Sequence, residues 1–206
     1  MTKLTDDEQV TLNSYNKNAT KWSAAHITPR YWGDDMEMFH KLLPKGRILE
    51  IGAGGGRDAI ELIALGYDYV GTDVSPNLLE EARKNNPGAE FKQFSLYKLN
   101  FDEPFDGFWC AAVLLHIPKK RINEALQAIK RNVKADGIGF ISIKEGEGER
   151  MNVGSDEEGG ERFFALWQNN EFKKVLLENG FKIIREGHFP KSETTKWLTY
   201  HVRTEK

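Results

Sequence analysis

The chain has 206 residues, 39% of them hydrophobic and 29% charged, and its formal net charge is −2. This length predicts one domain, residues 1–206, and the nearly balanced charge excludes an overall field that would draw the protein to nucleic acid or to an anionic membrane. The single cysteine, Cys110, excludes an internal disulfide, and the N-terminus lacks the apolar core of a signal peptide. We therefore expect a cytoplasmic protein that does not associate with membranes.

Residues 1–45 are predicted to form an N-terminal helical cover. Thr5 to Glu8 has the pattern of a capping box, which predicts the start of a helix, and a second helix is expected around Asp34 to Leu43. The segment between these helices is rich in aromatic residues. These rings either pack an N-terminal helix or close a ligand pocket with their faces toward a cation. They are Tyr15, Trp22, Tyr31 and Trp32.

Residues 46–144 predict a core in which strands alternate with helices. A strand over Arg47–Ile51 leads into a turn of glycines, and a helix over Ala59–Leu65 ends at Gly66. Ser75-Pro76 supplies an N-cap followed by proline, which predicts the next helix directly after the strand that ends at Asp73. Apolar spacing predicts three more strands and one more helix. They cover Glu90–Phe94, Gly107–Val113 and Ile138–Lys144, and Ile122–Val133.

Residues 145–206 predict an acceptor-side loop, a helix and two terminal strands. Glu145 to Glu161 is rich in glycine and glutamate, which is typical of an exposed loop or of a mobile lid that favours a neutral or cationic substrate. A helix is expected over Asn170–Asn179. Phe181–Phe189 and Trp197–Arg203 follow with no helix between them, so they predict an antiparallel hairpin at the edge of a sheet. The alternation before them predicts a parallel sheet covered by helices on both faces.

The glycine turn predicts a nucleoside site. Gly52, Gly54 and Gly56 follow Glu50, and Asp73 lies 23 residues after Glu50, near the roughly 20-residue spacing at which such units place a carboxylate against ribose hydroxyls. Glycines allow positive φ and close approach of a ligand. At Gly54 we expect the helix turn and the ligand to leave no room for a side chain.

The same glycines leave an alternative open. Gly54 to Ala59 fits the dinucleotide pattern G-x-G-x-x-A, which would indicate an NAD(P)-dependent oxidoreductase. In that register Asp58 would face the pyrophosphate at the helix start, where negative charge is unfavourable. An acid beside the turn favours a ligand that carries an ammonium group and no phosphate, such as S-adenosyl-L-methionine. A non-catalytic sensor of this ligand is the other alternative.

The Glu50-x-Gly52-x-Gly54-x-Gly56 pattern resembles motif I of the class I S-adenosylmethionine-dependent methyltransferases. The resemblance implies a Rossmann-like α/β fold with a mostly parallel seven-stranded sheet, helices on both faces and an antiparallel C-terminal hairpin. It also implies S-adenosyl-L-methionine as cofactor and S-adenosyl-L-homocysteine as product. Asp73 would bind the ribose and Val74 the adenine, while Ser95 departs from the family's usual adenine-binding aspartate. The implied cofactor-binding residues are Glu50, Gly52, Ala53, Gly54, Gly56, Arg57, Asp73, Val74, Ser75, Ser95, Leu96, Tyr97, Ala111, Ala112 and Tyr15.

The segment Cys110 to Pro118 resembles the family's fourth-strand motif, in which a histidine lies near the substrate. His116 is therefore the weak candidate for a catalytic residue, and its alternative role is to cap the following helix. Methyl transfer from a sulfonium is an in-line displacement that depends mainly on alignment, so no catalytic residue has to stand out. The other histidines have no metal-ligand spacing, and we predict no metal site.

The methyl acceptor is expected to be a small molecule. The chain lacks the sequence motifs of nucleic-acid methyltransferases, and the basic residues between Lys119 and Lys134 are typical of a solvated helix face rather than a nucleic-acid site. We expect a monomer or a homodimer.

Overall fold

The computed structural model describes residues 3–153, 160–190 and 195–205. Seven strands form one sheet in the order β3-β2-β1-β4-β5-β9-β8. Strands β1 to β5 pair in parallel, whereas β9 is antiparallel to both β5 and β8. The predicted α/β fold with a mostly parallel sheet and a C-terminal hairpin is confirmed. The strands are β1 Arg47–Ile51, β2 Asp68–Asp73, β3 Glu90–Gln93, β4 Phe105–Ala111, β5 Val133–Lys144, β8 Phe181–Pro190 and β9 Lys196–Thr204.

Helices cover both faces of this sheet because alternate strand residues point to opposite sides. Ile48 of β1 joins one buried apolar cluster with residues of α2, α3 and α4, and its neighbour Leu49 joins another with residues of α5 and α6. The two clusters form the two halves of the core. The helices are α2 Gly33–Leu42, α3 Arg57–Ala64, α4 Pro76–Asn85, α5 Ile122–Arg131 and α6 Asn169–Glu178.

Several helix ends lie where the sequence predicts them. α1, Asp6–His26, begins with the predicted capping box, in which the Glu8 N–H donates to Thr5 Oγ1 at 3.3 Å and the Thr5 N–H donates to Glu8 Oε2 at 2.7 Å. At the start of α4, Ser75 Oγ accepts from the Leu78 N–H at 3.1 Å. Gly66 follows α3 with φ +86°, a conformation that favours glycine.

The acidic segment after β5 differs from the prediction. Its described residues form an antiparallel hairpin of β6, Glu149–Val153, and β7, Glu161–Ala165, where the sequence predicts a loop or a mobile lid. Phe163 and Phe164 are each 4% exposed, and the Phe163 N–H donates to Thr11 Oγ1 at 2.9 Å. Burial of these rings, together with the contact between β7 and α1, outweighs the glycine and glutamate composition on which the loop prediction rests. Residues 154–159 lie outside the described residues.

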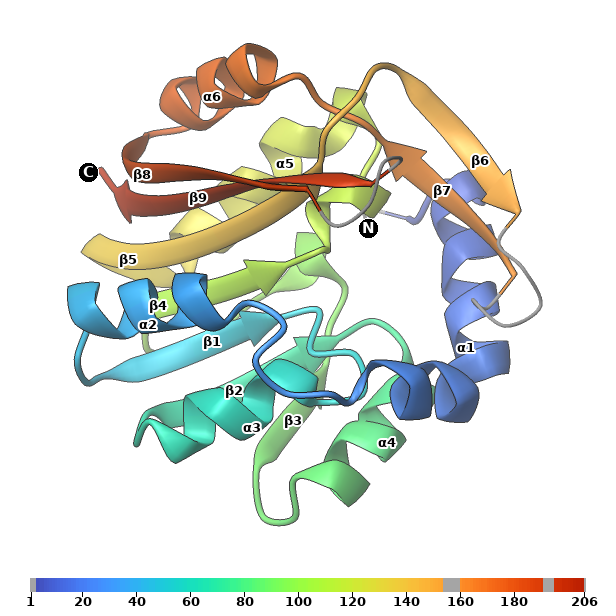
Figure 1. Ribbon diagram of the computed structural model, residues 1–206, viewed down its shortest axis with the longest axis horizontal. Coiled ribbons are helices and arrows are strands. Elements are labelled where there is room, and N and C mark those ends of the chain that lie inside the picture. Colours follow the sequence, from blue (N-terminus) through green and yellow to red (C-terminus); the bar gives the residue numbers. More distant parts are fainter. Residues whose placement is uncertain (1–2, 154–159, 191–194, 206) are drawn as a thin grey trace.

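Helix α1 and the β6–β7 hairpin lie beyond the carboxyl ends of the parallel strands. Figure 1 shows both at the right of the molecule, where the arrowheads of β1 and β4 point. α1 contacts α4 at one end and β7 at the other. The crevice at the carboxyl edge, where open α/β sheets bind ligands, thereby gains an outer wall. Within the described residues, none of the helices combines the length and the apolar character needed to cross a membrane.

Candidate cofactor and acceptor site

The glycine turn after β1 has the left-handed backbone that its sequence predicts. Gly52, Gly54 and Gly56 have φ of +70°, +54° and +81°. A Cβ built on Gly52 would collide with the Val113 side chain, whereas a Cβ on Gly54 would meet no protein atom within 4 Å. The expectation that the helix turn crowds Gly54 is therefore wrong. The turn leaves open space beside Gly54, and only backbone strain and a bound ligand can restrict a side chain there.

Asp73 at the end of β2 is bound to both neighbouring turns. Its Oδ2 accepts from the Gly54 N–H at 2.9 Å, and its Oδ1 accepts from the Ser75 N–H at 2.8 Å. Burial raises the pKa of Asp73, and the backbone hydrogen bonds oppose that rise. A carboxylate has about four lone-pair sites, so each Asp73 oxygen can accept one more hydrogen bond. This geometry fits a pair of vicinal ribose hydroxyls.

Glu50 lies at the carboxyl end of β1 and is 3% exposed. The Tyr69 hydroxyl donates to its Oε2. Burial and the neighbouring Asp58 raise the pKa of Glu50 to about 8. Asp58 itself accepts from Trp109 Nε1 at 2.9 Å and pairs with Arg57 at 2.6 Å. A buried acid with a raised pKa favours a nearby cation, because the cation stabilises its ionised form.

The predicted residues line one cavity of about 600 Å³, a size typical of small-molecule sites. Gly56 and Ser75 are exceptions that do not line it: Gly56 accepts from Asn86 Nδ2, and the buried Ser75 hydroxyl caps α4 and donates to Asn16 Oδ1. Their predicted contact with a ligand is therefore not supported. The predicted residues in the wall are Glu50, Gly52, Ala53, Gly54, Arg57, Asp73, Val74, Ser95, Leu96, Tyr97, Ala111, Ala112, Tyr15 and His116.

His116 also lies in the cavity wall and does not cap the following helix, so that alternative is wrong. Its Nδ1 lies 2.7 Å from the Phe163 carbonyl oxygen, and its Nε2 lies 2.9 Å from the Tyr15 hydroxyl. A carbonyl only accepts, so Nδ1 carries the proton, and Nε2 accepts from the Tyr15 O–H. Burial lowers the pKa of His116 to about 3. The imidazole is therefore neutral, and both of its nitrogens are engaged.

Several cavity residues were missed by the sequence analysis. Arg162 and Phe164 come from β7, Lys144 ends β5, and Trp197 lies near the start of β9. The position of Lys144 at the carboxyl end of a parallel strand could have indicated it. The β7 residues carry no such signal, because their segment has the composition of a loop. The four N-terminal aromatic residues Tyr15, Trp22, Tyr31 and Trp32 all line the cavity, as one of the two interpretations expects.

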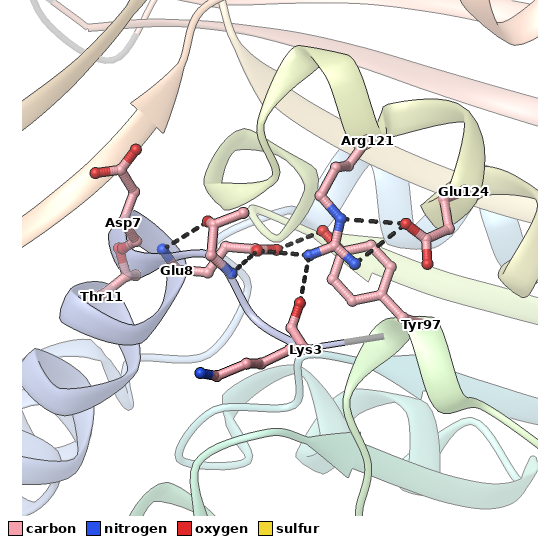
Figure 2. Close-up of polar contacts among 8 residues, drawn as sticks. Lys3, Asp7, Glu8, Thr11, Tyr97, Arg121 and Glu124 are labelled. Atoms are coloured by element: carbon pink, nitrogen blue, oxygen red, sulfur yellow. Dashed lines mark hydrogen bonds and ion pairs between the residues drawn. The ribbon is translucent and has the colours of Figure 1, made fainter. Parts of the chain in front are cut away.

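A buried ion pair anchors α1 beside Tyr97, which lines the cavity (Figure 2). Arg121 Nη1 pairs with Glu8 Oε2 at 2.7 Å, and the guanidinium lies 3.5 Å from the centre of the Tyr97 ring. The Tyr97 hydroxyl donates to Glu8 Oε1. The Arg121 and Glu8 side chains are 11% and 5% exposed. The interpretation of Arg121 as part of a solvated face is therefore wrong, and the Tyr97 hydroxyl is already engaged by α1.

Comparisons with known proteins agree with this architecture. A family described as "Methyltransferase domain" matches residues 48–137. The probable S-adenosyl-L-methionine-dependent methyltransferase TehB of Haemophilus influenzae is 25% identical over 142 residues, which cover 67% of this chain and 49% of TehB. The chain thus spans about half the length of this curated relative.

Two solved structures share the fold. The 1,6-didemethyltoxoflavin-N1-methyltransferase of Burkholderia thailandensis, with 1,6-didemethyltoxoflavin and S-adenosylhomocysteine bound, has a TM-score of 0.73 at 18% identity and covers 100% of this chain and 93% of its own. The DhpI–SAH complex has a TM-score of 0.74 at 19% identity and covers 97% of both chains.

A parallel sheet with a glycine turn after its first strand and a half-buried acid at the end of its second defines a nucleoside-binding α/β protein. The sequence comparisons narrow this class: residues 48–137 match the methyltransferase-domain family, and the chain is similar to S-adenosylmethionine-dependent methyltransferases. S-adenosylmethionine is the cofactor that gives these methyltransferases their name.

Proposed function

We propose that this protein transfers a methyl group from S-adenosylmethionine to a small-molecule acceptor. The observation that carries the proposal is the single cavity of about 600 Å³, which is continuous from Asp73 and Gly54 at one end to His116 and Arg162 at the other. One ligand beside the glycine turn and a second beside His116 would meet inside this cavity. Residues 46–144 would form the cofactor-binding core and add His116 and Lys144 to the acceptor side, residues 145–206 would supply further acceptor-side residues, and residues 1–45 would cover the cavity.

The residues at the nucleoside end fit the cofactor. Asp73 has lone pairs left for ribose hydroxyls, the space beside Gly54 is open, and Glu50 favours a nearby cation. Ser95 and Leu96 line the cavity where the family usually has an adenine-binding aspartate. When bound, the cofactor supplies an electrophilic methyl group: the acceptor's lone pair bonds to the methyl carbon, the carbon–sulfur bond breaks, and its electron pair stays on sulfur.

The protein's own contribution is to orient both ligands and to exclude water. α1 and β7 close the outer side of the cavity, and Tyr15 and His116 hold each other in fixed orientations. Fixing two reactants in line can lower the barrier by several kcal/mol, about 7 kcal/mol or more in well-oriented cases. An in-line displacement needs this alignment more than it needs a proton-transfer group.

Titration calorimetry with S-adenosylmethionine, S-adenosylhomocysteine and NAD tests the cofactor. We expect micromolar or tighter binding of the first two and none of NAD, because Asp58 places negative charge at the start of α3, where a pyrophosphate would lie. Binding of NAD alone would overturn the proposal in favour of an oxidoreductase. A screen of small acceptors for S-adenosylhomocysteine production then separates an enzyme from a non-catalytic sensor, which would release no product with any acceptor.

A further inference from the structure

Arg162 is a buried arginine without an acidic partner. The residue is 6% exposed, and its Nε has no hydrogen-bond partner. Within residues 3–153, 160–190 and 195–205, no carboxylate lies within 4.0 Å of the guanidinium nitrogens. In the same part of the chain its one hydrogen bond runs from Nη1 to the Tyr15 hydroxyl at 3.4 Å. A buried charge is unfavourable unless it is paired, and the described residues leave the Arg162 guanidinium without an anionic partner.

Aromatic rings surround this guanidinium. Its central carbon lies 4.7 Å from the centre of the Trp22 ring and 5.6 Å from the centres of the Tyr15 and Phe164 rings. Cation–π contacts of this kind offset part of the desolvation of the charge, but they leave its hydrogen-bond donors unused. Flat rings around a guanidinium also provide surfaces on which a flat ligand can pack.

A second cation lies close to the first. Lys144 Nζ is 4.4 Å from the centre of the Phe164 ring, and both Lys144 and Arg162 belong to the cavity wall. The same cavity wall also holds the acids Glu50 and Asp73. The wall therefore carries charges of both signs: the acids suit the cationic cofactor, and Arg162 and Lys144 suit an anion.

The hydrogen bonds of His116 also favour an anionic acceptor. Its Nδ1–H donates to the Phe163 carbonyl and its Nε2 accepts from Tyr15, so the ring has no lone pair left to take a proton from an acceptor. An alcohol or an ammonium acceptor has to lose a proton during methylation, whereas an acceptor that is ionised at neutral pH does not. The groups around Arg162 are suited to an acceptor that is ionised at neutral pH.

We propose that the acceptor is a small aromatic or conjugated carboxylate, whose carboxylate group is bound by the Arg162 guanidinium and whose flat body packs against Trp22 and Phe164. A guanidinium matches the two oxygens of a carboxylate with paired hydrogen bonds. The inference rests on the proposed methyltransferase function and refines it. It also replaces the sequence-based expectation of a neutral or cationic acceptor, because that expectation depends on an acidic lid, and the described part of the segment brings Arg162 into the cavity instead.

Tryptophan fluorescence in the presence of saturating S-adenosylhomocysteine tests the proposal. The probes are benzoate and cinnamate, each compared with its neutral amide. We expect the acids to bind at least tenfold more tightly than the amides. Arg162→Met should weaken acid binding about ten- to a hundredfold and remove this preference, while the affinity for S-adenosylhomocysteine stays at the wild-type value. Arg131→Met, which removes an exposed arginine at the end of α5, is the matched control. It should change neither the preference for acids over amides nor the affinity for S-adenosylhomocysteine.

The outcomes separate this proposal from the proposed function. Amides that bind as well as acids, an unchanged preference in Arg162→Met, or no binding of either acid would each overturn the proposal. A parallel loss of S-adenosylhomocysteine affinity in Arg162→Met would assign the guanidinium to the cofactor's own carboxylate and would also overturn it. Failure of the wild type to bind S-adenosylhomocysteine would instead remove the methyltransferase function. Arg162→Lys keeps the charge without the paired donors, so it should retain an intermediate preference even if the methionine variant does not fold.

Discussion

The nucleoside end of the cavity takes its walls from consecutive strand–helix turns between Glu50 and Ser95, whereas the acceptor end is assembled from α1, β5, β7 and β9. At the first end, backbone and carboxylates dominate, as in the Asp73 bonds to Gly54 and Ser75. At the second end, the groups are large side chains such as Trp22 and Arg162. A conserved type of ligand can be bound by local backbone geometry, but a variable acceptor requires side chains from distant segments.

The largest expected effect concerns the backbone of the nucleoside end. Gly54→Val should abolish binding of S-adenosylhomocysteine, because the new side chain fills the open space beside the turn. The variant should still fold, since strain of about 1–3 kcal/mol at one position is tolerable. Its melting temperature should therefore show no shift with saturating S-adenosylhomocysteine, whereas the wild type shifts upward.

Gly88→Val is a closely matched control for this change. Gly88 also has positive φ, +87°, and open space around its Cβ position, but it does not line the cavity. It should lose similar stability and keep the full ligand-induced shift. If Gly54→Val shifts like the wild type, the glycine turn is only structural.

A smaller effect is expected at Asp73. Asp73→Ala should weaken S-adenosylhomocysteine binding ten- to a hundredfold, because charge-assisted hydrogen bonds contribute about 1.5–3 kcal/mol. Calorimetry measures this change, and circular dichroism verifies the fold. Asp68→Ala, at the exposed start of the same strand, should bind like the wild type. Equal affinity of Asp73→Ala and the wild type would remove the carboxylate from the site.

Glu50 should make binding depend on protonation. Its pKa of about 8 in the free protein means that it is mostly protonated at pH 7. A cationic cofactor beside it lowers this pKa, so binding should release up to one proton. Calorimetry in buffers with different ionisation enthalpies measures the release, and Glu50→Gln should reduce it. Equal proton release by the variant and the wild type would place the cation elsewhere.

The raised pKa of Glu50 also predicts how the free energy of unfolding changes with pH. The folded-state pKa of Glu50 is raised above the unfolded value, so the folded protein binds more protons between these two values. The free energy of unfolding of the ligand-free protein should therefore fall as the pH rises from about 4.5 to about 8. Glu50→Gln should flatten this dependence in urea titrations. A parallel pH dependence in both proteins would contradict the assignment.

The smallest effect on cofactor affinity is expected from a substitution at the acceptor end of the cavity. Tyr15→Phe keeps the ring but leaves the Nε2 atom of His116 without its donor, which should lower the free energy of unfolding by about 1–3 kcal/mol. S-adenosylhomocysteine affinity should change by less than about threefold. A loss of affinity as large as that of Asp73→Ala would show that the two ends do not act independently.

The difference between the two ends also explains what the sequence could predict. Some features depend only on interactions between residues close in the sequence, and the structure contains each of those that were predicted. They are the Thr5 capping box, the Ser75-Pro76 helix start and the glycine turn. The positions of Arg162 and Phe164 depend on packing between segments far apart in the sequence, as in the Phe163–Thr11 hydrogen bond, which joins residues 152 positions apart. No local pattern encodes such a contact, and the glycine- and glutamate-rich composition of that segment indicated a loop.

The pair between Glu8 and Arg121 has a consequence for the protein in solutions of different ionic strength. Exposed pairs such as Arg30–Glu37, whose side chains are both 69% exposed, lose their attraction when dissolved ions screen them. Glu8 and Arg121 are shielded from mobile ions by the Tyr97 ring and by α1 itself. Concentrated salt should therefore weaken the exposed ion pairs but leave the pair between Glu8 and Arg121 intact. Helix α1 should then stay packed over the cavity at salt concentrations that screen most other ion pairs.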